Sequence, residues 1–173
     1  MIVGLLVNGV VYAAIFIVVA FLISRFTSEI AWRSFLVLFL FIAAGLYIVF
    51  AVRAGESAIW VVGELVGIAI FGGIGLLGLR GSLWWLVGAW VMHPLWDVGL
   101  HHLGPGRSFA PETYTIACLS FDLLVAAYIT IVYGLGLTGG RTDQRPEMAP
   151  VSLSTAPIHG DIRRVGPGPI RAS

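Results

Sequence analysis

The sequence predicts an all-α integral membrane protein, with a bundle of five transmembrane helices followed by a disordered C-terminal tail. Of the 173 residues, 58% are hydrophobic and only 11% are charged, and the mean hydropathy is +0.96. Such a chain is too apolar for a soluble domain. The hydrophobic residues also fall into five stretches, each close to the roughly 20 residues that a helix needs to cross a bilayer.

Polar or turn-forming residues separate the five stretches. The predicted spans are approximately residues 2–24, 34–52, 57–79, 83–102 and 113–137. Residues 25–33 are expected to form the first loop, and the glycines and prolines of 103–112 predict a loop without regular structure. From residue 139 onward, proline and arginine replace most large apolar residues, so 139–173 is predicted to be a disordered tail and 1–138 the transmembrane domain.

The arginines predict the orientation of the bundle in the cell membrane. Only Arg53 and Arg107 fall on the side of the second and fourth loops. The arginines of the first and third loops and of the tail are Arg25, Arg33, Arg80, Arg141, Arg145, Arg163, Arg164 and Arg171. Because cytoplasmic loops carry an excess of basic residues, we expect the N-terminus outside and the tail in the cytoplasm.

Composition also excludes some functions and favours certain partners. All ten basic residues are arginine, which excludes chemistry through a lysine Schiff base. A single cysteine, Cys118, excludes an intrachain disulfide or a CxxC redox pair. Membrane lipid is an expected partner and nucleic acid is not. In the third span, Gly63 and Gly67 form a small-xxx-small pair, which is typical of close helix packing and offers a face for a second copy of the chain.

Several ionisable residues lie inside the predicted spans, where such groups are costly and usually mark a site, and five of them form one candidate group. In the fourth span, His93, Asp97 and His101 fall within roughly 80° of one another around a helix. Glu64 in the third span and Asp122 in the fifth lie roughly 10 to 14 Å below the same outer surface. The sequence therefore predicts one buried polar site in the outer leaflet.

These residue types favour a divalent metal. Neutral histidine nitrogen and carboxylate oxygen suit Zn²⁺, Fe²⁺ or Mn²⁺, so the predicted ligands are His93, Asp97 and His101 with Glu64 or Asp122. Spacing of i, i+4, i+8 extends over about 12 Å, so one metal cannot take all three from a straight helix. Either the proline of this span bends the helix, or one residue orients a ligand, or two metals share the site.

The predicted function is a metal-dependent membrane enzyme that acts on a lipidic or other apolar small molecule, with the same five residues as catalytic candidates. Arg107 and His102, near the outer mouth, are candidates for substrate binding, and Arg107 is suited to an anionic head group. Three alternatives stay open. They are a proton-coupled carrier in which Glu64, Asp97 and Asp122 titrate, a purely structural hydrogen-bond network, and an accessory subunit of a larger membrane complex.

The pattern of these residues resembles a known family. His93-x3-Asp97-x3-His101-His102, then a proline-containing loop, then Cys118-x3-Asp122, is similar to the small bacterial membrane proteins of domain of unknown function 6010. The resemblance covers about residues 57–135. It implies a multi-pass membrane protein, and the family name supplies no activity.

Overall fold

The computed structural model describes residues 1–136, and all the regular structure within them is helical. In chain order the elements are α1 (Ile2–Phe26), α2 (Glu29–Arg53), α3 (Ala58–Arg80), α4 (Leu83–Trp96), the π-helix η1 (Asp97–His102), the 3-10 helix η2 (Pro105–Ser108) and α5 (Glu112–Gly134). The predicted tail, 139–173, lies outside the described residues. The all-α class that the sequence predicts is confirmed.

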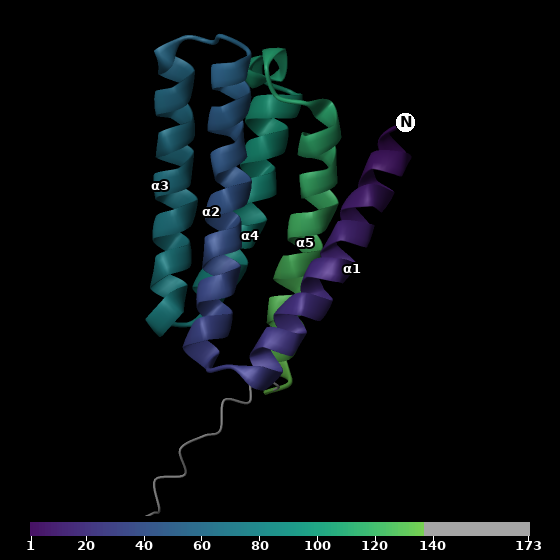
Figure 1. Ribbon diagram of the computed structural model, residues 1–173, viewed down its shortest axis with the longest axis vertical. Coiled ribbons are helices and arrows are strands. Elements are labelled where there is room, and N and C mark those ends of the chain that lie inside the picture. The colour runs from purple at the N-terminus through teal and green to yellow at the C-terminus, as the bar shows by residue number, and fades with distance from the viewer. Residues whose placement is uncertain (137–173) are drawn as a thin grey trace, which may run out of the picture. The chain divides into compact units, whose positions relative to one another are not determined.

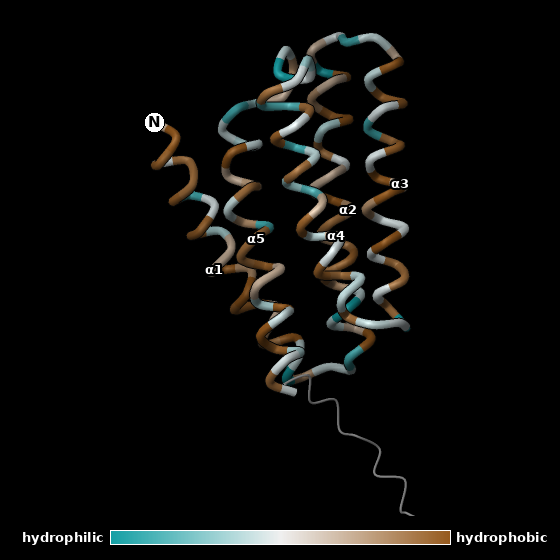
Figure 2. Tube along the Cα trace, turned by 180° about the vertical axis from the view of Figure 1, so that it is seen from behind, coloured by the Kyte–Doolittle hydropathy of each residue, from teal (hydrophilic) through white to brown (hydrophobic). Residues whose placement is uncertain are grey.

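By length and composition, four of the helices can cross a membrane, namely α1, α2, α3 and α5. Their outer faces carry large apolar side chains, such as Ile15, Leu38 and Ile59, that no other part of the bundle covers. Figure 2 shows hydrophobic residues along the whole length of these helices. Contiguous apolar surface of this extent is typical of a protein embedded in lipid. With only 14 residues, α4 is shorter than a span by itself.

The helices pack so that α4 lies between α3 and α5, α2 packs on α3, and α1 packs on α5. Figure 1 shows α1 leaning away from α2 toward its N-terminus. The main core lies where α1, α2, α4 and α5 meet and is built from large side chains such as Phe16, Leu36, Leu40 and Trp90. A smaller cluster of Tyr47, Ala51, Phe109 and Ala110 fills the other end of α2.

The second helix begins earlier than predicted. Instead of a loop over 25–33, α2 starts at Glu29, and Ser28 caps it by accepting a backbone N–H of the first turn. Arg33 pairs with Glu29 one turn away and donates to two backbone carbonyls at the C-terminal end of α3. A charged pair within the first turns lowers the local hydropathy, which is why these helical residues resembled a loop.

The segment 103–112, predicted to lack regular structure, contains the single 3-10 turn η2. Pro105 stands at its first position, where the fixed proline φ angle fits and no N–H is needed. Phe109 and Ala110 follow this turn and are buried against Tyr47. The loop thus closes one end of the bundle.

The fourth predicted span, 83–102, is helical throughout but changes its geometry. Pro94 has no N–H to donate to the Trp90 carbonyl, and three residues later the chain passes from α-helix to π-helix. At the end of η1 the N–H of Leu103 donates to the carbonyl of Val98, an i to i−5 bond of 2.9 Å. Short π-helical turns inside helices are frequent at functional sites.

Candidate metal centre

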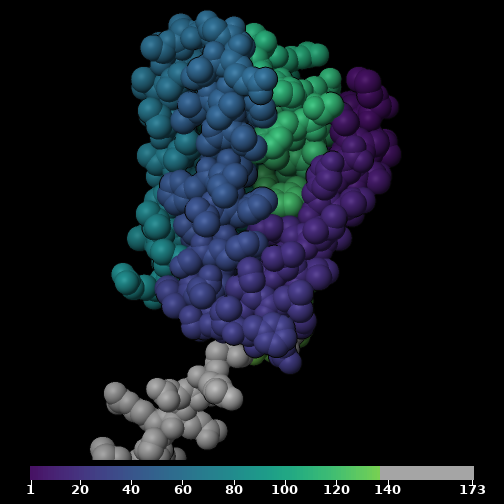
Figure 3. Space-filling view, in the orientation of Figure 1, coloured from purple at the N-terminus to yellow at the C-terminus, as the bar shows by residue number. Residues whose placement is uncertain are grey.

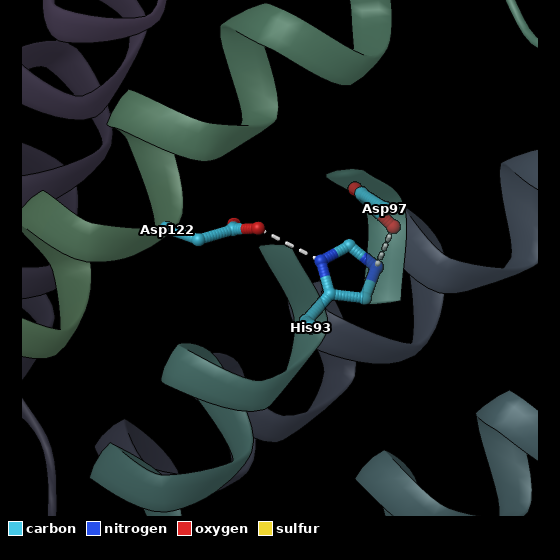
Figure 4. A group of neighbouring side chains, drawn as sticks. All are labelled: His93, Asp97 and Asp122. Atoms are coloured by element: carbon cyan, nitrogen blue, oxygen red, sulfur yellow. Dashed lines mark hydrogen bonds and ion pairs between the residues drawn. The ribbon is translucent and has the colours of Figure 1, made fainter. Parts of the chain in front are cut away.

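His93 stands at the centre of a buried group of three side chains (Figure 4). Its Nδ1 lies 2.8 Å from Oδ2 of Asp122 on α5, and its Nε2 lies 3.8 Å from Oδ1 of Asp97, the first residue of η1. One candidate ligand atom from each residue lies within 4.8 Å of the other two. The π-helix and α5 therefore bring two carboxylates to the two sides of one imidazole.

The two nitrogens of His93 have different roles. With Asp122 ionised, Nδ1 carries the proton and donates it to the carboxylate, which leaves the lone pair of Nε2 facing Asp97. A carboxylate that holds one ring nitrogen in this way is the usual means of orienting a metal-binding histidine. The structure thus favours Asp122 as the orienting residue, one of the arrangements that the sequence left open.

The atoms that face each other have no hydrogen-bond partner among residues 1–136. They are Nε2 of His93 and both carboxylate oxygens of Asp97, and Asp97 is fully buried. Each buried polar group without a partner costs about 1–3 kcal/mol. Two ligands of one metal, each at about 2.1 Å, can lie up to roughly 4.2 Å apart. The separation of 3.8 Å between His93 Nε2 and Asp97 Oδ1 is therefore too long for a hydrogen bond and suits a shared cation.

His101 and Glu64 form a second pair and do not belong to the three-residue group. Nε2 of His101 lies 2.9 Å from Oε1 of Glu64, and both side chains are buried. Tyr47 stacks on the His101 ring, with centroids 3.8 Å apart and planes at 8°, and Phe109 meets the same ring edge-on. The five predicted residues therefore divide into a histidine with two carboxylates and a histidine with one.

A small cavity connects the two groups. Glu64, His93 and Asp97 all line it, together with Tyr47 and apolar side chains of α2, α3 and α4. It is too narrow at every point for a water molecule. Glu64 thus lies at the same gap as His93 and Asp97.

Comparison with known proteins assigns the chain to a family. The model of a family of unknown function (DUF6010) matches residues 6–136, which is most of the chain. The chain belongs to this family. Membership confirms the resemblance seen in the histidine and cysteine motifs and extends it over the first two helices. No curated protein and no solved structure matches the chain.

The two predicted substrate-binding residues of this DUF6010 chain lie outside both groups. Nδ1 of His102 is 4.0 Å from Oε1 of Glu112, and its side chain is partly exposed. Arg107 is exposed on η2. Their part in substrate binding stays a prediction.

Sequence reasoning missed Tyr47, because the second span showed no sign of chemistry. Besides stacking on His101, the Tyr47 hydroxyl lies 3.4 Å from Oγ1 of Thr115, another buried polar residue. One signal was available. Tyr47 stands six residues before Arg53 at the end of its helix, in the half of the bundle that also holds Glu64.

The small-residue pair of α3 is used in part within the chain. Gly67 is buried, and a Cβ there would lie 3.3 Å from the Trp96 ring. Gly63 has nothing within 4 Å of its Cβ position. Pairing of two copies through this face stays a prediction.

Proposed function

We propose that this protein is a membrane metalloenzyme that binds one divalent cation through Nε2 of His93 and the carboxylate of Asp97. Asp122 orients His93, and the substrate is a lipidic or other apolar small molecule. One observation carries the proposal: His93 is held by Nδ1, while its Nε2 and both Asp97 oxygens are buried and unpaired within residues 1–136. A nitrogen and oxygen ligand set of this kind suits Zn²⁺, Fe²⁺ or Mn²⁺.

The remaining residues of the site have roles that follow from their positions. Glu64 faces the same cavity and supplies a further carboxylate, as ligand or as proton acceptor. His101 holds Glu64 by a 2.9 Å hydrogen bond and can pass a proton to or from it. A bound divalent cation would supply Lewis-acid polarisation of a substrate oxygen or activation of a water molecule.

The proposal includes a fifth span and an orientation. The 14 residues of α4 and the six of η1 together reach the roughly 20 residues that a membrane crossing needs. Arg25, Arg33 and Arg80 lie in the terminal turns of α1, α2 and α3 next to the first and third loops, so we place that end of the bundle in the cytoplasm and the N-terminus outside. In this orientation the metal group lies nearer the outer surface.

A proton-coupled carrier is the alternative that a specific observation favours. Two histidine–carboxylate pairs, His93 with Asp122 and His101 with Glu64, meet at one cavity. Chains of such pairs serve as proton relays in transporters. In a carrier, replacing Glu64 or Asp122 by the neutral amide stops proton-coupled flux, whereas His93→Ala leaves substrate binding intact.

Metal content separates the two functions. Protein expressed with Zn²⁺, Fe²⁺ and Mn²⁺ supplied and purified in detergent should hold one metal ion per chain by inductively coupled plasma mass spectrometry. His93→Ala should abolish the bound metal, and Asp122→Asn should weaken binding about 10- to 100-fold, as loss of an orienting partner does. The matched control is Glu112→Gln, on the same helix as Asp122 but outside the group.

The melting temperatures of the same variants show whether a loss of metal comes from the site itself or from unfolding of the protein. Equal metal loss in Glu112→Gln and Asp122→Asn would contradict the assigned site. Wild-type protein that melts normally and retains none of the three metals would overturn the proposal and leave the carrier.

A further inference from the structure

A long groove runs between α1 and α2, with α5 as its floor (Figure 3). Its volume is about 460 Å³. The apolar side chains that form its walls and floor are Leu5, Phe39, Ile42, Leu46, Ala117 and Phe121. We call it the α1–α2 groove. Small-molecule sites have volumes of about 300–1,000 Å³ and mostly apolar walls, and the groove lies within this range.

The groove results from how α1 crosses α5. At Gly9 the two helices are so close that a Cβ would lie 2.2 Å from the carbonyl oxygen of Ala117. Ser120 strengthens the crossing by donating a 2.8 Å hydrogen bond to the carbonyl of Leu6. Because the N-terminal half of α1 packs on α5, it does not cover α2, and the groove remains between them. Because α1, α2 and α5 can all cross a membrane, the groove opens onto hydrocarbon, and its occupant must be apolar.

Polar side chains also line this groove, namely Asn8 and Tyr12 on α1 and Thr113, Tyr114 and Cys118 on α5. Asn8 and Tyr12 lie one turn apart on α1, and neither makes a side-chain hydrogen bond within residues 1–136. Asn8 is six residues from the start of α1, about 9 Å along the axis at 1.5 Å per residue. At such a depth an amide without a partner costs free energy, so these groups favour an occupant that carries a hydrogen-bonding oxygen.

The charge and the size of the groove narrow the class of occupant. No Asp, Glu, Lys, Arg or His lines it, so a phosphate or carboxylate would find no counter-charge there. The volume of about 460 Å³ is that of a site for a small molecule. A slender hydrocarbon chain with a neutral oxygen group fits this size and the absence of charged side chains.

We infer that the α1–α2 groove binds one uncharged long-chain lipid, with its hydroxyl, carbonyl or ester oxygen hydrogen-bonded to Asn8 and Tyr12. Phe121 lines the groove and Asp122 is the next residue of α5, but none of the three residues of the metal group lines the groove itself. Tyr114, which donates a 2.9 Å hydrogen bond to the carbonyl of Ala43, closes the wall between α5 and α2. Lipid binding in the groove is independent of the proposed function. The further step, that the bound lipid is the enzyme's substrate, rests on the proposed function.

Photolabelling tests the inference. The full-length protein in phosphatidylcholine nanodiscs is labelled with a diazirine-bearing hexadecanol, and the labelled residues are mapped by mass spectrometry. Labels should concentrate on the groove residues of α1, α2 and α5, and unlabelled hexadecanol should compete better than hexadecanoate. Asn8→Leu should weaken binding about fivefold, the effect of losing one hydrogen bond.

Two tryptophan substitutions on α2 provide a matched pair. Ile42 is half exposed and lines the groove, whereas Leu38, one turn away and 60% exposed, does not. Ile42→Trp should fill the groove and remove its labelling, while Leu38→Trp should leave the labelling unchanged. Leu46→Trp, from the next turn of the same wall, serves if Ile42→Trp fails to fold.

The other outcomes test the lipid site and the proposed metalloenzyme function separately. Labels spread evenly over the outer surface and unaffected by Ile42→Trp would overturn the lipid site, as would cross-links showing a second copy of the chain seated in the groove. Groove labelling that persists in His93→Ala supports lipid binding whether or not a metal is found. Bound metal without groove labelling would refute the lipid site alone.

Discussion

At the scale of single residues, the two buried histidines have opposite surroundings. His93 uses one nitrogen to bind Asp122 and leaves the other facing Asp97, whereas His101 binds Glu64 and is stacked on Tyr47. Each histidine keeps one buried ring nitrogen without a hydrogen-bond partner among residues 1–136, but only the free nitrogen of His93 faces a second carboxylate, that of Asp97. This difference is why we assign metal binding to His93 and a supporting role to His101.

The supporting role of His101 predicts a loss of stability. His101→Ala leaves Glu64 buried without its partner and removes the stack on Tyr47, so the free energy of unfolding should fall by about 1–3 kcal/mol. His102→Ala is the matched control, because the His102 side chain is partly exposed and loses only the 4.0 Å contact of its Nδ1 with Oε1 of Glu112. Its effect should stay within about 0.5 kcal/mol. Similar losses of melting temperature in both variants would contradict the assigned role.

The candidate residues were predictable and their grouping was not. Glu64, His93, Asp97 and Asp122 can be identified from their hydrophobic surroundings, because an ionisable group inside a membrane span is energetically costly and usually belongs to a site. Angular position on one straight helix placed His101 in the same group as His93. The π-helical turn after Asp97 changes that position, and its partner Glu64 comes from another helix, which spacing along one span does not reveal.

At the scale of elements, the apolar composition predicts that the long helices exist. Where each helix begins and ends depends on local hydrogen bonds, which composition does not reveal. The extents of α1, α3 and α5 are close to the predicted spans, because long apolar runs determine them. The start of α2 was wrong, since the cap by Ser28 and the pair of Glu29 with Arg33 are polar features of a helix that hydropathy assigns to a loop.

The crossing of α1 over α5 predicts a steric effect at one glycine. A Cβ at Gly9 would lie 2.1 Å from Oγ of Ser120 and 2.2 Å from the carbonyl oxygen of Ala117, a backbone atom that cannot move aside. Gly9→Ala should therefore destabilise the bundle by about 1–3 kcal/mol, as overpacking does. Gly4→Ala, on the same helix with nothing within 4 Å, should not lower the melting temperature. Equal behaviour of the two variants would mean that α1 does not cross α5 at Gly9.

At the scale of the whole molecule, the candidate functional features lie in one half of the described bundle. The His93 group, the Glu64 pair and the α1–α2 groove all involve the half where α5 begins and η1 ends. Trp32, Trp90 and Leu36, by contrast, belong to the main apolar core where α1, α2, α4 and α5 meet. The bundle thus combines a tightly packed core with a polar site.

The fifth span predicts a topology that reporter fusions can measure. If α4 and η1 together cross the membrane, a reporter fused after Gly81 lies in the cytoplasm and one fused after Gly104 lies outside. Paired alkaline phosphatase and green fluorescent protein fusions at the two positions should therefore give opposite results. The same side for both would show that this segment does not cross and would reduce the spans to the four long helices.

The most direct test of the metal centre is an X-ray absorption spectrum at the edge of the metal that the purified protein retains. We predict nitrogen and oxygen scatterers only, at about 2.0–2.2 Å, with the contribution of one imidazole. A sulfur scatterer at about 2.3 Å would place the metal on Cys118 instead and contradict the assignment of His93 and Asp97.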